Sequence, residues 1–435
     1  MDEKDKRIKE LEKLLFKALA RIEELERRLG LNSSISHKPP SSDGLGKKPT
    51  PQSLRSKSEK PSGGQKGHKG VTLMQIAEPH HVTKHQVMTC GACQKSLETT
   101  PVASYLKRQV FDIPEPKIEV TEDQAEVKVC SCGHKTTASF PDDVRAPVQY
   151  GPRVKALAVY LGYQQMIPED RLENVFLDVF HLPIATSTLT SFHKAFGVKA
   201  QPIQEVVLHI VKQAPVKHLD ETSLRIGGKT RWLHVMSTGK QTHYRVSEKR
   251  GNLLDDVRGT VVHDHWKPYF KMENVRHALC NAHHLRELKA LQEIEKEPWA
   301  FEMANVLPIF NHPGKPCLKK AEASYDKIVE EGVRYHEAQP PLSQRKNKSR
   351  PGHNLVLRLR DFKEDVLRFL TDEDVPFTNN QAEQDIRMMK VKMKISGCFR
   401  TFQGADLFCV IKGFLSTAQN QQQNLFQAIY AAIAA

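Results

Sequence analysis

The sequence lacks any uninterrupted apolar run long enough to span a bilayer, so we expect no membrane-spanning helix. Its first residues are charged from Asp2 onward and contain no apolar core of a secretion signal. Cysteine is also scarce, because eight residues in a chain of 435 do not suggest a disulfide scaffold. These absences predict a cytoplasmic protein and make the closely spaced cysteines candidates for metal binding.

The charged residues are unevenly balanced, with 65 Lys and Arg against 51 Asp and Glu, which leaves a net charge of +14. A polyanionic partner is the simplest reason for this excess, because phosphate neutralisation supplies most non-specific nucleic-acid affinity. A length of 435 residues also exceeds one ordinary hydrophobic core. We therefore expect a multidomain α+β protein of roughly two to four folded units.

Residues 1–30 are nearly free of helix breakers and carry apolar residues at alternating steps of three and four. This spacing is the seam of a coiled coil, and its members are Ile8, Leu11, Leu15, Ala18, Ile22, Leu25 and Leu29. The flanking positions would pair Arg7 with Glu12 and Arg21 with Glu26 between two parallel copies. The pattern predicts a parallel homodimer, and the alternative is one amphipathic helix packed on its own chain.

Residues 31–75 are rich in Ser, Pro and Gly and cannot bury a core, which predicts a flexible linker. Between His37 and Gly70 this segment holds eight Lys or Arg residues against two acidic ones. Such a basic tether, with Lys66 and Lys69 near its end, either follows a DNA backbone or serves as a solvated spacer.

Four of the eight cysteines form two close pairs within residues 80–145: Cys90 and Cys93 in CGAC, and Cys130 and Cys132 in CSCGH. Two pairs separated by β-like runs such as RQVFDI are typical of a zinc ribbon, in which four thiolates hold a structural Zn²⁺. Only one residue separates the second pair, so His134 is an alternative ligand. We predict that the remaining, scattered cysteines are mostly buried apolar residues: Cys280, Cys317, Cys398 and Cys409.

Residues 146–212 are predicted to form a helical domain with the size and turn of a helix-turn-helix. One helix starts after Pro168 and runs to about Phe180, and a second follows the turn HLPIAT with Ser187 as its cap. The second helix would present Lys194 and two hydroxyl side chains to DNA. The alternative is a helical hairpin that supports the next domain.

Two aspartates lie on apolar strands in residues 213–288, the predicted first part of the core. VKHLDETSLRI (216–226) carries Asp220 at its middle, and GTVVHDHWKPY (259–269) delivers Asp264 near its end. Two further strand-like runs, TRWLHVMST and THYRVSE, lie between them. Because hard carboxylate oxygens suit Mg²⁺, the pair predicts a divalent-metal site.

The segment PFTNNQAEQDIRMMKVKMK (376–394) supplies a third carboxylate on a predicted helix. Thr378 and Gln381 match a capping box, so the helix is expected to start at about Asn379. Its buried side would then consist of three apolar residues, namely Ile386, Met389 and Met393.

Glu383, Arg387 and Lys390 share one face of that helix, at i, i+4 and i+7. Taken alone, this pattern describes an exposed ion pair that contributes about 0.3–0.5 kcal/mol. Taken with the two strand aspartates, it favours a metal ligand backed by two phosphate contacts. Lys392, on the same helix, is a further candidate phosphate contact.

These motifs together resemble the insertion-sequence-66 family of bacterial transposases, which are DDE enzymes with a ribonuclease-H-like core. The likeness covers nearly the whole length, including the N-terminal helix, GGQKGHKG, the CGAC and CSCG pairs and APVQYGPRVKALAVYL (146–161). It continues through LDETSLRIGGKTRWLHV, VVHDHWKPYF, HALCNAHHLREL (277–288) and NNQAEQDIRMMKVKMKISGCFRT (379–401). Several long motifs in one order are far more specific than any single motif.

The resemblance implies that Asp220, Asp264 and Glu383 are the catalytic triad and hold two Mg²⁺ or Mn²⁺ ions roughly 4 Å apart. It implies a transposase that cleaves the 3′ ends of its element and joins them to target DNA. The implied partners are the terminal inverted repeats, target DNA and small accessory proteins, and the implied location is the nucleoid. Two rival interpretations are a Mg²⁺ nuclease on the same core and a non-catalytic zinc-ribbon regulator.

The long interval before the third carboxylate, residues 289–375, is predicted to be a helical insertion in the core. Residues 376–435 then form the last part of the core and a closing helix. The basic stretch at 345–350 is either a DNA contact or a solvated loop.

Several residues near the aspartates keep more than one interpretation. Cys280 and His283 have the spacing of half a metal site, but their partners cannot be identified from the sequence. The role of these two residues, and of His284, stays open between a turn near the active site and a DNA contact. Trp266 either packs against a flipped base or belongs to the core.

Overall fold

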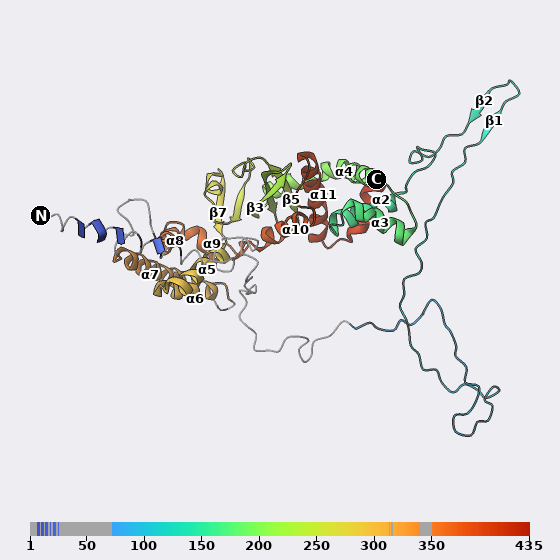
Figure 1. Cartoon of the computed structure of the whole chain (residues 1–435), viewed down its shortest axis with the longest axis horizontal. Helices are drawn as coiled ribbons and strands as arrows, with labels where there is room; N and C mark the ends of the chain where they lie inside the picture. The colour runs from blue at the N-terminus through green and yellow to red at the C-terminus, as the bar shows by residue number, and fades with distance from the viewer. Residues whose placement is uncertain are drawn as a thin grey trace. The chain divides into compact units, whose positions relative to one another are not determined.

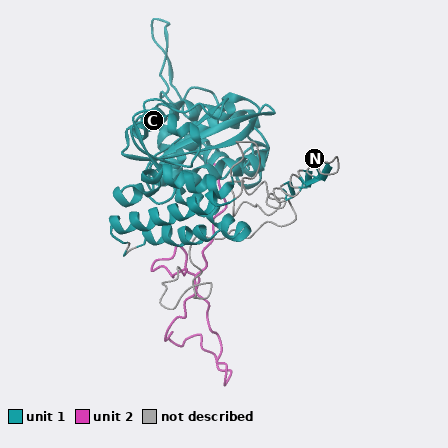
Figure 2. Ribbon diagram, turned by 90° about the vertical axis from the view of Figure 1, so that its left-hand side faces the viewer, with its two compact units in different colours: residues 1–51, 120–435 teal, residues 52–119 magenta. Residues whose placement is uncertain are grey.

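The computed structural model describes residues 72–312, 314, 316–339 and 350–435, together with separate positions between Arg7 and Leu25. The chain divides into two compact units, one of residues 1–51 with 120–435 and one of residues 52–119 (Figure 2). The predicted DNA contacts Lys66 and Lys69, and most of the basic stretch at 345–350, lie outside the described residues. None of the described helices is both long and apolar enough to cross a bilayer.

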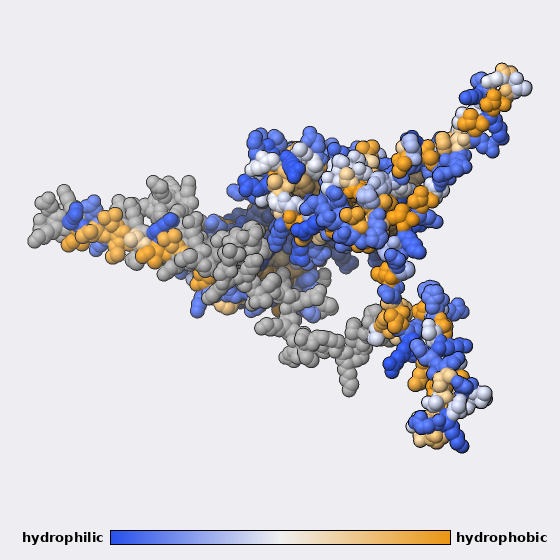
Figure 3. Space-filling model, turned by 45° about the vertical axis from the view of Figure 1, so that its right-hand side comes forward, coloured by the Kyte–Doolittle hydropathy of each residue, from blue (hydrophilic) through white to orange (hydrophobic). Residues whose placement is uncertain are grey.

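The described positions of the N-terminal segment are helical. Large apolar residues of the predicted seam are exposed there by 43% or more (Figure 3), and they are Ile8, Leu11, Leu15, Ile22 and Leu25. The helix therefore presents an apolar stripe to solvent, which is the surface that a coiled coil would cover. Leu29, the last member of the predicted seam, lies outside the described residues.

Residues 72–119 contain one isolated β-bridge, between Thr89 and Ser96, and no longer strand. The strand predicted for RQVFDI (108–113) does not form, and Val110 within it is 91% exposed. Alternating apolar residues make a strand only where a partner strand and a core receive them, and neither is present here.

A short antiparallel hairpin surrounds the second cysteine pair. Its strands are β1 Val127–Val129 and β2 Lys135–Thr137, and the turn between them holds Cys130 and Cys132. Gly133 in this turn has a φ of +87°, a conformation that glycine adopts without strain.

A five-stranded sheet lies at the centre of the larger unit, in the order β5–β4–β3–β6–β7 (Figure 1). Strands β3 Val216–Ile226, β4 Lys229–Ser237 and β5 Thr242–Ser247 form an antiparallel meander. Strands β6 Gly259–His263 and β7 Val275–Leu279 add to it in parallel, with β6 beside β3. The predicted strand 216–226 coincides with β3.

Gly259 allows the chain to enter β6. Its φ is +84°, and a Cβ at this position would lie only 2.6 Å from the carbonyl oxygen of Pro215. The first residue of the strand that leads to Asp264 must therefore be glycine, because both the backbone conformation and the available space exclude a side chain.

Three helices precede the sheet: α2 Pro152–Val159, which continues as the π-helical turn η2 Tyr160–Gln164, then α3 Glu169–Phe180 and α4 Thr186–Gln213. The bounds of α3 agree with the predicted helix after Pro168. The predicted cap of the next helix is wrong, because α4 starts at Thr186 and Ser187 already lies inside it. The 28-residue α4 packs on α2, α3, α11 and β5, so its buried face supports the core.

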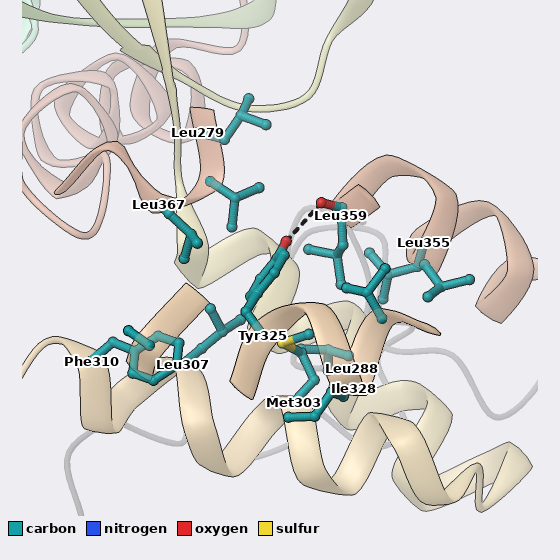
Figure 4. Close-up of a cluster of buried hydrophobic side chains, with 14 of the residues drawn as sticks. Leu279, Leu288, Met303, Leu307, Phe310, Tyr325, Ile328, Leu355, Leu359 and Leu367 are labelled. Atoms are coloured by element: carbon teal, nitrogen blue, oxygen red, sulfur yellow. Dashed lines mark hydrogen bonds between the residues drawn. The ribbon is translucent and has the colours of Figure 1, made fainter. Parts of the chain in front are cut away.

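The predicted helical insertion lies beside β7 (Figure 1). Its predicted start, residue 289, falls inside α5 Asn281–Ala290. After this helix come the π-turn η4 Leu291–Glu295, α6 Pro298–Phe310, α7 Leu318–Glu337, α8 Pro351–Asp361 and α9 Lys363–Thr371. These helices pack around a hydrophobic core that contains Met303, Leu307 and Tyr325 (Figure 4). The Tyr325 hydroxyl donates a hydrogen bond of 2.8 Å to the Leu359 carbonyl, and Leu279 joins this core to the sheet.

The last three helices are α10 Asn380–Ser396, α11 Phe402–Asn420 and α12 Leu425–Ala434. Ile386 and Met389 of α10 are buried and Met393 is partly buried, as predicted. A short 3₁₀ turn, η3 Lys267–Lys271, completes the elements between β6 and β7.

Helices cover both faces of the sheet. On one face, α10 and α11 pack on Leu224 of β3, and on the other, α4 packs in the cluster that contains Leu219. Side chains alternate between the two faces along a strand. Asp220 therefore shares the α10 face with Leu224, whereas Glu221 shares the α4 face with Leu219.

Candidate active site

Strands β3 and β6 bring the two predicted aspartates to one level of the sheet. Their ladder pairs Val216 with Thr260 and His218 with Val262, so Asp220 and Asp264 each follow the last pair of the ladder by two residues. Asp264 directly follows β6, and its Oδ1 accepts a hydrogen bond of 2.9 Å from the Trp266 N–H. The two carboxylates thus come from neighbouring parallel strands.

Electrostatics link these aspartates to the third predicted carboxylate. The pKa of Asp220 is raised well above its usual value, first by burial and then by the negative charges of Glu221, Asp264 and Glu383. The Glu221 backbone N–H, 2.8 Å from Oδ1 of Asp220, acts in the opposite direction. Carboxylates that repel one another in this way bind a shared proton or cation. The charges of Asp264 and Glu383 therefore reach the Asp220 carboxyl, although the carboxylate oxygens of the three residues do not all lie within 4.8 Å of one another.

Glu383 lies in the first turn of α10, which packs on β3 and β4. The capping box predicted for Thr378 and Gln381 does not form, because no side chain caps this helix. Asn379 instead binds the strand below: its Nδ2 donates to the Leu219 carbonyl at 2.7 Å, and its Oδ1 lies 2.9 Å from Nδ1 of His218. This tertiary attachment, rather than a local cap, holds the start of α10 above Asp220.

The junction of β7 and α5 surrounds the same carboxylate. Oε1 of Glu383 lies 3.9 Å from Sγ of Cys280, 3.8 Å from Nδ1 of His283 and 3.9 Å from Nη2 of Arg286. The buried Cys280 thiol accepts a hydrogen bond of 3.1 Å from the Asn379 N–H, and burial raises its pKa to about 12. Cys280 is buried as predicted, but it contacts polar groups rather than a purely apolar environment.

The surroundings of His284 and of the other scattered cysteines are more varied. His284 is 2% exposed, and its Nδ1 lies 3.1 Å from Oδ1 of Asn281, so it faces the protein interior rather than a DNA surface. Cys409 is buried as predicted, whereas Cys317 and Cys398 are exposed. The prediction that the scattered cysteines are mostly buried is thus correct for two of the four.

A further carboxylate, Glu221, was not identified from the sequence pattern. Its side chain is 1% exposed and accepts hydrogen bonds from the Tyr269 hydroxyl and from Nε of Arg250, the latter at 2.8 Å. The Arg250 guanidinium lies 4.2 Å from the ring centroid of Trp266 and 5.1 Å from that of Trp232. Arg250 therefore covers the Trp266 ring, which favours the interpretation that this tryptophan belongs to the core.

The predicted DNA contacts on the helices differ in accessibility. Arg387 and Lys390 are exposed on α10, and Lys194 is exposed on α4. Lys392 is half-buried, and burial lowers its pKa while the charge of Glu169 raises it again. The Lys392 ammonium therefore interacts with Glu169 of α3 and is less accessible to DNA than Arg387 and Lys390.

Each predicted zinc-binding pair occupies a tight turn. The Cys90 N–H donates to Lys95 at 2.9 Å, and the backbone N–H groups of Cys93 and Ala92 lower the pKa of the Cys90 thiol. In the second pair, the Cys130 N–H donates to the His134 carbonyl at 2.9 Å, and the Cys132 backbone lowers the pKa of the Cys130 thiol. Backbone donors directed at a sulfur favour the thiolate form, which is the form that binds metal.

The fold is that of a mixed α+β protein, with Asp220 on the central sheet, Asp264 directly after β6 and Glu383 on the helix that packs on β3. The Transposase IS66 family matches residues 147–407, which is more than half of the 435 residues and includes all three carboxylates. The chain belongs to this family of transposases. Residues 1–73 match a second family, one of unknown function. No curated protein matches the chain.

Proposed function

We propose that the protein is a DDE transposase that cleaves the 3′ ends of an insertion element and joins them to target DNA. The observation that carries this proposal is that the negative charges of Asp264 and Glu383 both raise the pKa of the buried Asp220 carboxyl. A ribonuclease-H-like core is supported by the antiparallel strands β3 to β5, followed by β6 and β7 in parallel.

The three carboxylates fit Mg²⁺ or Mn²⁺. All their donor atoms are hard oxygens, and their mutual repulsion is the charge that a cation would neutralise. Asp220, Asp264 and Glu383 would hold the ions. When bound, such ions polarise the reacting phosphate and activate the attacking water or hydroxyl.

The protein's own residues would position the reactants and bind phosphate. Asn379 attaches the first turn of α10 to β3 and so would hold Glu383 in a defined position relative to that strand. Arg387 and Lys390, exposed on the turns that follow Glu383, would contact the DNA backbone. Water would first attack the phosphodiester at the element end and free a 3′-hydroxyl. That hydroxyl would then attack a target phosphodiester in line, without a covalent protein intermediate.

The remaining segments would bind DNA and pair two subunits. Cys90, Cys93, Cys130 and Cys132 would form a structural zinc ribbon, with His134 as an alternative ligand; the turns described above fit thiolate coordination. Lys194 and the basic linker with Lys66 and Lys69 would contact DNA. The N-terminal helix would pair two copies so that both element ends are processed together, and small accessory proteins of the element would join them.

The proposal is tested with the purified full chain, Mg²⁺ and a duplex that carries the terminal inverted repeat found beside the gene. We expect cleavage to a 3′-hydroxyl end and a strand-transfer product with a pre-cleaved end. Asp264→Ala should reduce both by about 10³-fold or more while DNA binding is retained. Asp178→Ala, an exposed aspartate on α3, is the matched control and should keep both activities.

Two outcomes would replace the proposal. Cleavage without joining of the pre-cleaved end would identify a nuclease on the same core. Specific binding without cleavage or joining, in the wild type and in Asp264→Ala alike, would identify a non-catalytic regulator.

A further inference from the structure

Three side chains of different chemical type meet beside the carboxylate site. One ligand atom each from Cys280, His283 and Glu383 lies within 4.8 Å of the other two. Within the described ranges, no other group of three His, Cys, Asp or Glu residues comes this close. The half metal site seen in the sequence as Cys280 and His283 thus has a third ligand, and it comes from a helix about a hundred residues away.

The backbone holds these ligands in place. The Cys280 N–H donates to the His263 carbonyl at 2.9 Å, which attaches the turn to β6, and the His283 N–H donates to the Cys280 carbonyl at 3.1 Å. On the other side, the Asn379 N–H donates to Sγ of Cys280, and the Glu383 N–H donates to the Asn379 carbonyl at 3.2 Å. The first turns of α5 and α10 therefore meet at this thiol.

The donor set differs in kind from the oxygen-only set of the two aspartates. A thiolate and an imidazole are softer ligands, which Mg²⁺ avoids and Zn²⁺ prefers. We propose that Cys280, His283 and Glu383 form a second metal site, one that takes Zn²⁺ or a similarly thiophilic divalent ion. The side chains of His283 and Glu383 are 17% and 26% exposed, so an ion can reach them from solvent.

Binding exchanges one proton for one ion. The S–H bond of Cys280 breaks, its proton passes to solvent and a metal–sulfur bond forms, while neutral His283 supplies a nitrogen lone pair. The Asn379 N–H, already directed at Sγ, stabilises the thiolate. Arg286 competes with the ion, because its Nη2 lies 3.9 Å from Oε1 of Glu383. The site should therefore bind zinc more weakly than a structural site with four thiolates.

Glu383 is common to both metal sites. An ion held by Cys280 and His283 draws this carboxylate away from Asp220 and Asp264. Zn²⁺ should consequently inhibit the Mg²⁺-dependent reaction by occupying a neighbouring site. This consequence rests on the proposed function, whereas the metal site itself does not.

The direct test measures bound metal on the full chain by equilibrium dialysis against increasing free Zn²⁺. Wild type should bind about one more ion per chain than Cys280→Ser and His283→Gln, and the four cysteines of the proposed ribbon cancel in this difference. With Co²⁺ in place of Zn²⁺, the wild-type minus Cys280→Ser spectrum should contain a thiolate-to-metal charge-transfer band. Cys317→Ser, which removes an exposed thiol, is the control and should behave like wild type.

If Cys280→Ser fails to fold, the His283→Gln comparison alone decides the question. Equal ion counts in wild type and in every folded variant would overturn the inference. In the cleavage assay at fixed Mg²⁺, His283→Gln should need about 10-fold or more Zn²⁺ for half-inhibition relative to its own zinc-free rate. If the wild type binds the additional ion but does not cleave DNA, the proposed function is wrong and the metal site stands. If the wild type cleaves DNA but binds no additional ion, the metal site is wrong and the proposed function stands.

Discussion

At the scale of single residues, the buried Asp220 carboxyl has a cost in stability that depends on pH. Its folded-state pKa is raised, first by burial and then by neighbouring carboxylates, so folding favours the protonated form. The carboxyl group therefore stabilises the fold at low pH, and this contribution is lost as the pH rises through the raised pKa. At neutral pH the metal-free protein must therefore either bury this charge beside other carboxylates or take up a proton on folding.

Asp220→Asn should separate stability from activity. We expect a higher Tm than wild type at about neutral pH in the presence of a chelator, because the substitution removes the buried charge. The difference should shrink below about pH 4, where the carboxyl group is protonated in the unfolded chain as well. Strand cleavage should fall by about 10³-fold. Thermal unfolding at the two pH values checks this, with Asp178→Asn as the exposed control; an equal or lower Tm at neutral pH would contradict it.

At the scale of elements, one side chain attaches α10 to the sheet. Asn379 is 1% exposed and joins the Leu219 carbonyl to the His218 ring. Its removal would leave a buried carbonyl without this donor and would loosen the turn that carries Glu383. The start of the helix thus matters more to the site than to the overall fold.

Asn379→Ala should cost about 1–3 kcal/mol in the free energy of unfolding, because a buried hydrogen-bond partner is lost. Cleavage activity should decline even under conditions in which the variant is fully folded, because Glu383 would no longer be held in one position relative to β3. Denaturant unfolding and the cleavage assay measure the two effects. Asn380→Ala, at the next and exposed position, is the matched control; similar losses in both variants would refute a special role for Asn379.

Local patterns predicted the elements more successfully than the contacts between them. The apolar run 216–226 coincides with β3, and the helix after Pro168 has the expected bounds, because burial periodicity and proline act on neighbouring residues. The capping box at Thr378 fails because the helix starts one residue later than that box requires, with Asn379 at the N-cap, and the Asn379 side chain binds β3 instead of the helix. Cys280 lacked a visible partner for a similar reason, since Glu383 reaches it only through the tertiary fold.

At the scale of the whole molecule, the exposed apolar stripe of the N-terminal helix calls for a partner surface. If that surface is a second copy, Ile22→Glu should convert the dimer to a monomer, because a charge at a core position of a coiled coil is buried without a counterion. Analytical ultracentrifugation measures the change. Glu10→Gln, off the seam, should leave the dimer intact, and an unchanged mass for Ile22→Glu would exclude this mode of pairing.

Helix α4 gives the molecule a mechanical connection between two of its parts. It extends for 28 residues, about 42 Å, carries Lys194 in its first half, and ends two residues before β3. Because this helix is continuous, a displacement of its first turns should also move the strand that bears Asp220. Pro202 interrupts the hydrogen bonding within this helix, so any bending should concentrate there, between Lys194 and the start of β3.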